Sequence, residues 1–170
     1  PHLLESGMIT KILIRAYEPA FGIIGDPAKR DPKTRQSADH SMVFIVSRLI
    51  RRAQEARASL AGASNDEHWK QSMLMPYDYD QNALQDPETR KLMSLIAFEH
   101  GGPEYDRNYP DGIPTSVVIE DSKGQTFDSG LVMYPAGHAR NTTADLEGIL
   151  SHKWGLMGDL AGTPQALAHL

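Results

Sequence analysis

Apolar side chains recur with the period of an α-helix in the segment from residue 39 to residue 58. The recurring positions lie at i, i+3, i+4, i+7 and i+11: Met42, Ile45, Val46, Leu49 and Ala53. This spacing places them on one face of a helix with about 3.6 residues per turn. The pattern predicts an amphipathic helix that begins near Asp39 and buries this face against a sheet.

Shorter segments mix β-branched and polar residues in the manner of β-strands. They are residues 8–16, with residues 20–24 as a continuation after Pro19, and residues 115–120 and 126–133. The last two segments flank the turn sequence Ser-Lys-Gly-Gln. Two such segments joined by a short turn predict an antiparallel hairpin.

Two further helices are expected beyond the first. Asp86, Pro87 and Glu88 are typical of a helix start, with Leu92, Met93 and Ile96 on its apolar face. A last helix is expected over residues 144–156. The predicted fold class is therefore α+β, an antiparallel β-sheet packed on one face by helices. We expect one domain over residues 1–157 and a tail over residues 158–170.

The composition is that of a globular protein, with 40% hydrophobic and 23% charged residues among 170. The formal net charge is −5. A nucleic-acid partner is not expected, because phosphate binding needs clustered Lys and Arg. No apolar run reaches the roughly 18 residues that span a bilayer, and the first residues do not resemble a signal peptide. We expect no membrane association and a cytoplasmic location.

Several kinds of cofactor site lack their sequence signal. There is no cysteine, which excludes disulfides and a cysteine-ligated iron–sulfur cluster within this chain. The seven histidines show none of the HxH, HxxxH or HExxH spacings of metal sites. No glycine-rich nucleotide-binding motif is present. We therefore expect neither a metal nor another cofactor.

Asp39 and His40 are the first candidate for chemistry, because both fall near a predicted helix start. In a functional interpretation, His40 hydrogen-bonds or protonates a substrate while Asp39 fixes its tautomer. In a structural interpretation, Ser37 or Asp39 caps the helix and His40 packs against the sheet. Adjacent Asp39, His40 and Ser41 do not form a catalytic triad, because neighbouring helical side chains point about 100° apart.

Two groups of residues could bind an acidic substrate. The first is a cationic lead-in to the helix, which also contains Asp26 and Asp31: Lys29, Arg30, Lys33 and Arg35. The second is the segment Gly137, His138 and Arg140, which follows the predicted hairpin. Guanidinium and imidazolium groups bind carboxylates by charge-assisted hydrogen bonds. A solvated loop and an ordinary strand-to-helix connection are the structural alternatives.

Several segments resemble, in the same order, those of the MmgE/PrpD family. They are residues 37–46 (SADHSMVFIV), 74–79 (LMPYDY), 86–90 (DPETR), 109–114 (YPDGIP) and 134–140 (YPAGHAR). The resemblance extends from about residue 10 to residue 154 and is strongest to the 2-methylcitrate dehydratases of the family.

The resemblance implies a two-domain enzyme of which this chain is the smaller, C-terminal domain. The family's N-terminal helical domain has no counterpart here, and the chain does not begin with Met. We therefore expect a longer protein, with its active site between the domains and much of its acid–base machinery in the missing part. Tyr77, Tyr79 and Tyr109 are expected to meet the helical domain, and the isolated chain is expected to be inactive. A homodimer is also implied, and a mitochondrial matrix location if the source is eukaryotic.

The implied reaction is dehydration of 2-methylcitrate to 2-methyl-cis-aconitate without a cofactor, a step of propionate catabolism. By matching motifs, His40 and Asp39 are the expected catalytic residues. The expected substrate-binding residues are Arg35, Ser41, Gly137, His138 and Arg140. Related family activities, iminodisuccinate epimerase and cis-aconitate decarboxylase, stay open, although Phe21 stands where the decarboxylases have a site tyrosine. A non-catalytic α+β binding or dimerisation module is the alternative from another functional class.

Overall fold

The computed structural model describes residues 8–162 and contains a four-stranded sheet. Its strands are β1 (Ile9–Ala16), β2 (Ile96–His100), β3 (Thr115–Asp121) and β4 (Thr126–Asp128), in the spatial order β2-β1-β3-β4. β1 pairs antiparallel with β3, and β3 pairs antiparallel with β4. The predicted α+β class and hairpin are confirmed. β2 pairs parallel with β1, so the sheet is mixed and not purely antiparallel. A long helical connection from β1 to β2 permits this parallel pairing.

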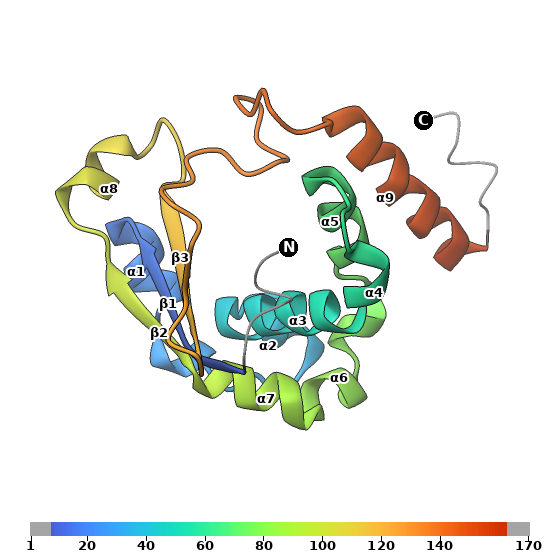
Figure 1. Cartoon of the computed structure of the whole chain (residues 1–170), viewed down its shortest axis with the longest axis horizontal. Helices are drawn as coiled ribbons and strands as arrows, with labels where there is room; N and C mark the ends of the chain where they lie inside the picture. The colour runs from blue at the N-terminus through green and yellow to red at the C-terminus, as the bar shows by residue number, and fades with distance from the viewer. Residues whose placement is uncertain (1–7, 163–170) are drawn as a thin grey trace.

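Helices occupy most of the chain between β1 and β2, and one long helix follows the sheet (Figure 1). They are α1 (Glu18–Ile24), α2 (Arg35–Ala38), α3 (Met42–Glu55), α4 (Arg57–Leu60), α5 (Asn65–Ser72), α6 (Gln81–Gln85), α7 (Pro87–Ser94), α8 (Pro103–Asn108) and α9 (Leu146–Ala161). Two 3₁₀ turns are η2 (Pro27–Lys29) and η3 (Pro76–Tyr79). Figure 1 shows α5 and α9 on the far side of α3 from the sheet. Among the described helices, none is long and apolar enough to cross a membrane.

One face of the sheet supplies the core. The strand register aligns Ile12 with Ile96 and Ile119 across three strands, and these side chains pack with Phe44 of α3 and Leu92 of α7. The opposite face carries ion pairs between neighbouring strands, such as that between Arg15 and Glu99, or between Lys11 and Glu120. Because side chains alternate along a strand, one face is apolar and covered while the other is largely polar.

The buried face of α3 differs from the predicted one. Its buried residues are Val43, Phe44, Ser47 and Ile50, whereas Ile45, Leu49 and Ala53 are only half-buried. Met42 and Val46 pack against the core from its edge. The buried stripe includes the polar residue Ser47. A pattern based on apolar residues alone does not count this position, and it therefore selected the neighbouring stripe of α3.

Several predicted boundaries are corrected by the structure. Residues 20–24 belong to helix α1, because Pro19 lies in its first turn, where proline is tolerated. Ile96 begins β2 and does not belong to the preceding helix. The helix from residue 42 ends at Glu55, and α9 continues to Ala161, past the predicted tail boundary. β4 is shorter than predicted, although Val132 still pairs with Thr115 as an isolated bridge.

Candidate functional site

Asp39 and His40 lie in a two-helix junction whose backbone is fixed on both sides. α2 begins with a capping box in which Thr34 and Ser37 satisfy each other's backbone groups. α3 begins at the N-cap Ser41, which is fully buried. The Ser41 hydroxyl donates to the carbonyl of Lys29 at 2.6 Å and accepts from the Phe44 N–H at 3.3 Å. Asp39 and His40 therefore precede α3, which begins at Met42 and not near Asp39 as the sequence predicted.

The imidazole of His40 is held at one nitrogen and open at the other. Nδ1 lies 3.0 Å from the carbonyl oxygen of Gln36 and also contacts the Asp39 carboxylate. The side chain of His40 is 78% exposed, and within residues 8–162 no hydrogen bond to Nε2 is found. Nδ1 can donate to the Gln36 and Asp39 oxygens, so Nε2 points outward, free to exchange a proton with a ligand.

Electrostatics favour the protonated form of this ring. The Gln36 carbonyl first, and then the Asp39 carboxylate, raise the pKa of His40 above its ordinary value, against smaller opposing effects of burial and of the Lys29 charge. The raised pKa widens the pH range in which the ring is protonated, and a protonated imidazolium can donate a proton or bind a carboxylate. The carbonyl end of α2 also faces His40, and the partial negative charge there favours the protonated ring.

The cationic lead-in is partly used by internal contacts. Lys33 and Arg90 both pair with Asp31, and the guanidinium of Arg30 stacks over the ring of Phe98 at 5.4 Å. Arg35 is exposed, in the first turn of α2, and makes no ion pair with any residue that the structure describes. Its carbonyl accepts from the Asp39 N–H at 3.1 Å, so Arg35 belongs to the same turn as the Asp39–His40 pair.

The second predicted group forms a separate turn. Arg140 donates to the carbonyl of Asp111 at 3.0 Å, and its backbone N–H donates to Nδ1 of His138 at 3.1 Å. The ring of His138 packs on Tyr134, 5.0 Å between centroids, and Gly137 is exposed. This turn lies between β4 and α9, well away from α2 in Figure 1. Within the described chain, no polar or ring contact joins it to Asp39 or His40, so the structure separates the two predicted groups.

A titratable cluster that the sequence did not indicate lies at the end of β2. Nε2 of His100 is 3.0 Å from a carboxylate oxygen of Asp106 and 3.6 Å from one of Glu18. The backbone N–H of Glu18 and the His100 ring lower the pKa of Asp106. Glu18 and Asp106 are 88 positions apart in the sequence, and no local spacing signals such a contact.

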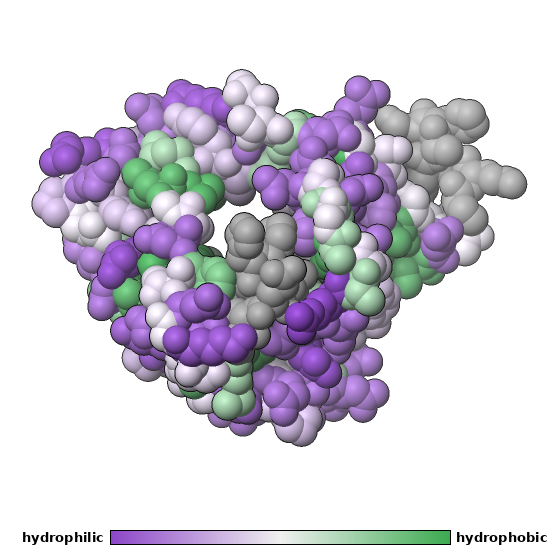
Figure 2. All heavy atoms as spheres, in the orientation of Figure 1, coloured by the Kyte–Doolittle hydropathy of each residue, from purple (hydrophilic) through white to green (hydrophobic). Residues whose placement is uncertain are grey.

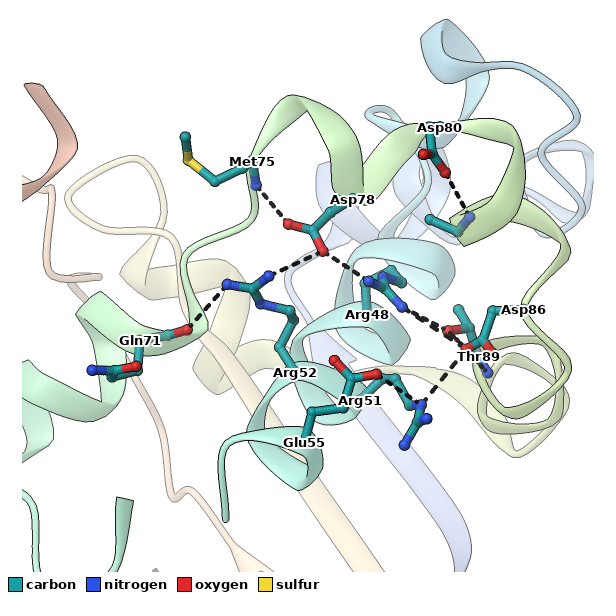
Figure 3. Close-up of polar contacts among 11 residues, drawn as sticks. Arg48, Arg51, Arg52, Glu55, Gln71, Met75, Asp78, Asp80, Asp86 and Thr89 are labelled. Atoms are coloured by element: carbon teal, nitrogen blue, oxygen red, sulfur yellow. Dashed lines mark hydrogen bonds and ion pairs between the residues drawn. The ribbon is translucent and has the colours of Figure 1, made fainter. Parts of the chain in front are cut away.

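Figure 3 shows an ion-pair network, centred on the Asp78 carboxylate, that joins α3 to η3 and to the start of α7. The carboxylate of Asp78 is fully buried and bonds to Arg48 at 2.8 Å and to the Met75 N–H at 2.8 Å. The next residue, Tyr79, packs its ring on Phe44 at 5.7 Å between centroids. Burial and the charge of nearby Asp39 raise the pKa of Tyr79. Because the Asp78 carboxylate is fully buried and bonds to the Met75 N–H, its role is structural, and it fixes the η3 segment that carries Tyr79.

Comparison with known proteins adds no assignment. No known family model matches the chain, and no curated protein matches it. Over residues 8–162, the structure contains no group of three or more side chains arranged to hold a metal ion.

Proposed function

We propose that the chain is the smaller domain of an MmgE/PrpD-type hydro-lyase and that Asp39 and His40 act on a small di- or tricarboxylate. The observation that carries this proposal is the exposed imidazole of His40, which is fixed through Nδ1 and open at Nε2. Its pKa is raised by the Gln36 carbonyl and by Asp39. An exposed ring held in one orientation without a role in the core is suited to a ligand.

In dehydration of 2-methylcitrate, a base removes the proton from the carbon alpha to a carboxylate. The electron pair of that C–H bond forms the new double bond, and the neighbouring C–O bond breaks. We assign the proton that the leaving hydroxyl takes up to Nε2 of His40, so that water departs and 2-methyl-cis-aconitate is formed. Asp39 then stabilises the ring as it is reprotonated. We assign the base to the helical domain of the complete protein.

Carboxylate binding is assigned to the exposed guanidinium of Arg35, one turn before His40. The hydroxyl of Ser41 is buried and used by two backbone groups, so Ser41 supports the junction instead of touching the substrate. The turn of Gly137, His138 and Arg140 lies apart from this junction. We propose that it contacts the substrate only through the closed, two-domain form of the enzyme.

Exposed apolar side chains support a further domain or subunit. Tyr77 and Tyr109 are 49% and 43% exposed, and Trp154 on α9 is 44% exposed. Figure 2 shows the molecule hollowed between the sheet and the α5–α9 side. Tyr109 stacks on Tyr17 and Tyr77 lies under Arg52, so each of these side chains is partly covered within the chain and leaves one face open. We propose that the helical domain and a second subunit of a homodimer cover them. Tyr79 is half-buried against Phe44 and is not available for this contact.

The test is turnover by the complete protein, which includes the helical domain, and by the 170-residue chain alone. The complete protein should convert 2-methylcitrate to a conjugated product that is followed by its ultraviolet absorbance, and the chain alone should not. Iminodisuccinate and cis-aconitate test the other family activities. Absence of turnover of all three by the complete protein would favour the non-catalytic module, and turnover by the chain alone would contradict the two-domain site.

A further inference from the structure

A surface cavity of about 350 Å³ lies where α7 is followed by β2. Three segments line it: Arg30 and Asp31 after η2, Arg90, Met93 and Ser94 of α7, and Ile96 at the start of β2. Its volume falls in the range of about 300–1,000 Å³ that is common for small-molecule sites. None of these six residues belongs to the Asp39–His40 junction, so the cavity is a separate candidate site.

Two guanidinium groups give the cavity an excess of positive charge. Arg30 and Arg90 face a single acid, Asp31, in a chain whose formal net charge is −5. That acid is also shared with Lys33, whose Nζ lies 2.7 Å from a carboxylate oxygen. A local excess of positive charge on an acidic protein attracts anions, so the expected ligand carries a negative charge.

The charges of the two arginines are used to different extents. The Arg90 guanidinium pairs with Asp31. Arg30 has no ion-pair partner among the described residues, and its guanidinium carbon lies 5.4 Å from the centroid of the Phe98 ring. Stacking on an aromatic ring restrains a guanidinium while its N–H groups stay available to a carboxylate or a phosphate. Arg30 is therefore the free cation of the cavity, and Arg90 is a second donor that Asp31 holds in place.

The remaining lining indicates that the ligand has an apolar part. Met93 and Ile96 are buried hydrophobic residues that form a wall beside the two arginines. The Ser94 hydroxyl donates to the Lys91 carbonyl at 2.7 Å, so we do not assign it to the ligand. Guanidinium groups beside an apolar wall are suited to an anionic group attached to a short apolar body.

We propose that this cavity binds a small molecule that carries a phosphate or carboxylate group on a short apolar body. Arg30 and Arg90 bind the oxygens of the anionic group, and the apolar wall contacts the body. Asp31 competes with the ligand for Arg90, because the same guanidinium can hold either anion. The proposal goes beyond the reaction assigned to His40 and does not depend on it.

The test is ¹H–¹⁵N and methionine-methyl NMR of the 170-residue chain, titrated at constant ionic strength with inorganic phosphate, phenyl phosphate and benzoate. The amide signals of Arg30 and Arg90 and the methyl signal of Met93 should shift with phenyl phosphate or benzoate. The ligand with the lower Kd identifies the preferred anionic group. Phenyl phosphate should bind about 10-fold more tightly than inorganic phosphate, because its ring covers apolar surface. Absence of these shifts, or equal Kd values for the two phosphates, would overturn the proposal.

Four variants show whether the cavity is the site that the tighter ligand occupies. Arg30→Gln and Arg90→Gln should each weaken binding by about 10-fold, the scale of one charge-assisted hydrogen bond. Asp31→Asn should strengthen binding by roughly 2-fold to 5-fold, the scale of an exposed charge pair, and misfolding cannot produce this gain.

Arg107→Gln is the matched control, because it makes the same change of charge at an exposed position of α8. α8 lies at the other end of β2 from α7 (Figure 1), so binding should stay unchanged. An equal loss in Arg107→Gln, or unchanged binding in the three cavity variants, would overturn the proposal and leave Asp31 and Arg90 as a structural ion pair.

Discussion

Asp78→Asn keeps the size of a buried side chain and removes its charge. Asp78 is fully buried, and its carboxylate bonds to Arg48 at 2.8 Å and to the Met75 N–H at 2.8 Å, with Arg52 at 3.6 Å (Figure 3). The Arg48 side chain is only 11% exposed. An asparagine in this place leaves a nearly buried guanidinium without its main counter-charge.

The expected loss follows from the partners that Arg48 keeps. Removing one member of a buried ion pair costs about 3–5 kcal/mol. Arg48 retains a weaker contact with Asp86 at 3.8 Å and a hydrogen bond to Thr89 at 3.4 Å, which places the loss near the lower end, at about 3 kcal/mol. For a chain of this length, that loss corresponds to a decrease in Tm of roughly 6–12 °C.

Urea unfolding followed by circular dichroism measures this loss as a lower midpoint at an unchanged m-value. Asp80→Asn is the matched control in the same segment. Asp80 is exposed and accepts from the Ala83 N–H as a helix N-cap, a role that asparagine fills equally well. Asp80→Asn should therefore change stability by less than about 0.5 kcal/mol. Equal losses in the two variants, or no loss in Asp78→Asn, would refute the reasoning.

Three further changes test the junction and the sheet. Ser41→Ala should destabilise the protein by about 2 kcal/mol in urea unfolding, because α3 loses its N-cap and the Lys29 carbonyl loses its donor; an unchanged midpoint would contradict the capping role. Asp39→Asn should lower the pKa of His40 while the adjacent backbone carbonyl keeps part of the shift, as NMR titration of the imidazole would show. The pKa of His40 is raised in the folded protein. Its contact with Asp39 should therefore stabilise the folded protein fully at pH values below the pKa of His40 in the unfolded chain. This stabilisation should be lost as the pH rises through the pKa of His40 in the folded protein. Gly101→Ala should cost about 1–3 kcal/mol in thermal unfolding, because a Cβ there would lie 2.2 Å from the tyrosine ring of α8.

The elements that the sequence predicted correctly are those with local signals. α7 begins at Pro87, and its N-cap Asp86 accepts from the Thr89 N–H, as the Asp-Pro pattern indicates. β1, β3 and the hairpin follow from alternation and from a four-residue turn. The position of β2 in the sheet depends on a crossover of about eighty residues' length, and no local pattern encodes it.

The buried face of α3 shows a second limit of the sequence. Ser47 is fully buried although its hydroxyl is polar, and Ile45 is left half-exposed although it is apolar. The neighbouring sheet decides which stripe is covered, and tertiary packing overrides the pattern within a single helix. Residues 20–24 show a related limit. They were expected to extend the strand, but Pro19 lies in the first turn of α1 and the chain is helical there.

The geometry around the Asp39–His40 pair could not be predicted from the sequence. His40 and Asp39 were recognisable as an adjacent titratable pair. Their place between two capped helices depends on Ser41 and on its contact with Lys29, twelve positions earlier. The separation of the Arg140 turn from this pair, and the contact of His100 with Asp106, depend on how distant segments meet, which spacing along the chain does not specify.

The measurement that tests the account most directly is His40→Ala in the complete protein, with kcat/KM for 2-methylcitrate and Tm determined on the same preparation. Because the ring is 78% exposed, Tm should change little, as for other surface substitutions. Loss of a proton donor at the reacting centre should lower kcat/KM by roughly 100-fold or more. A lower Tm with nearly unchanged kcat/KM would contradict the account and make His40 a structural residue.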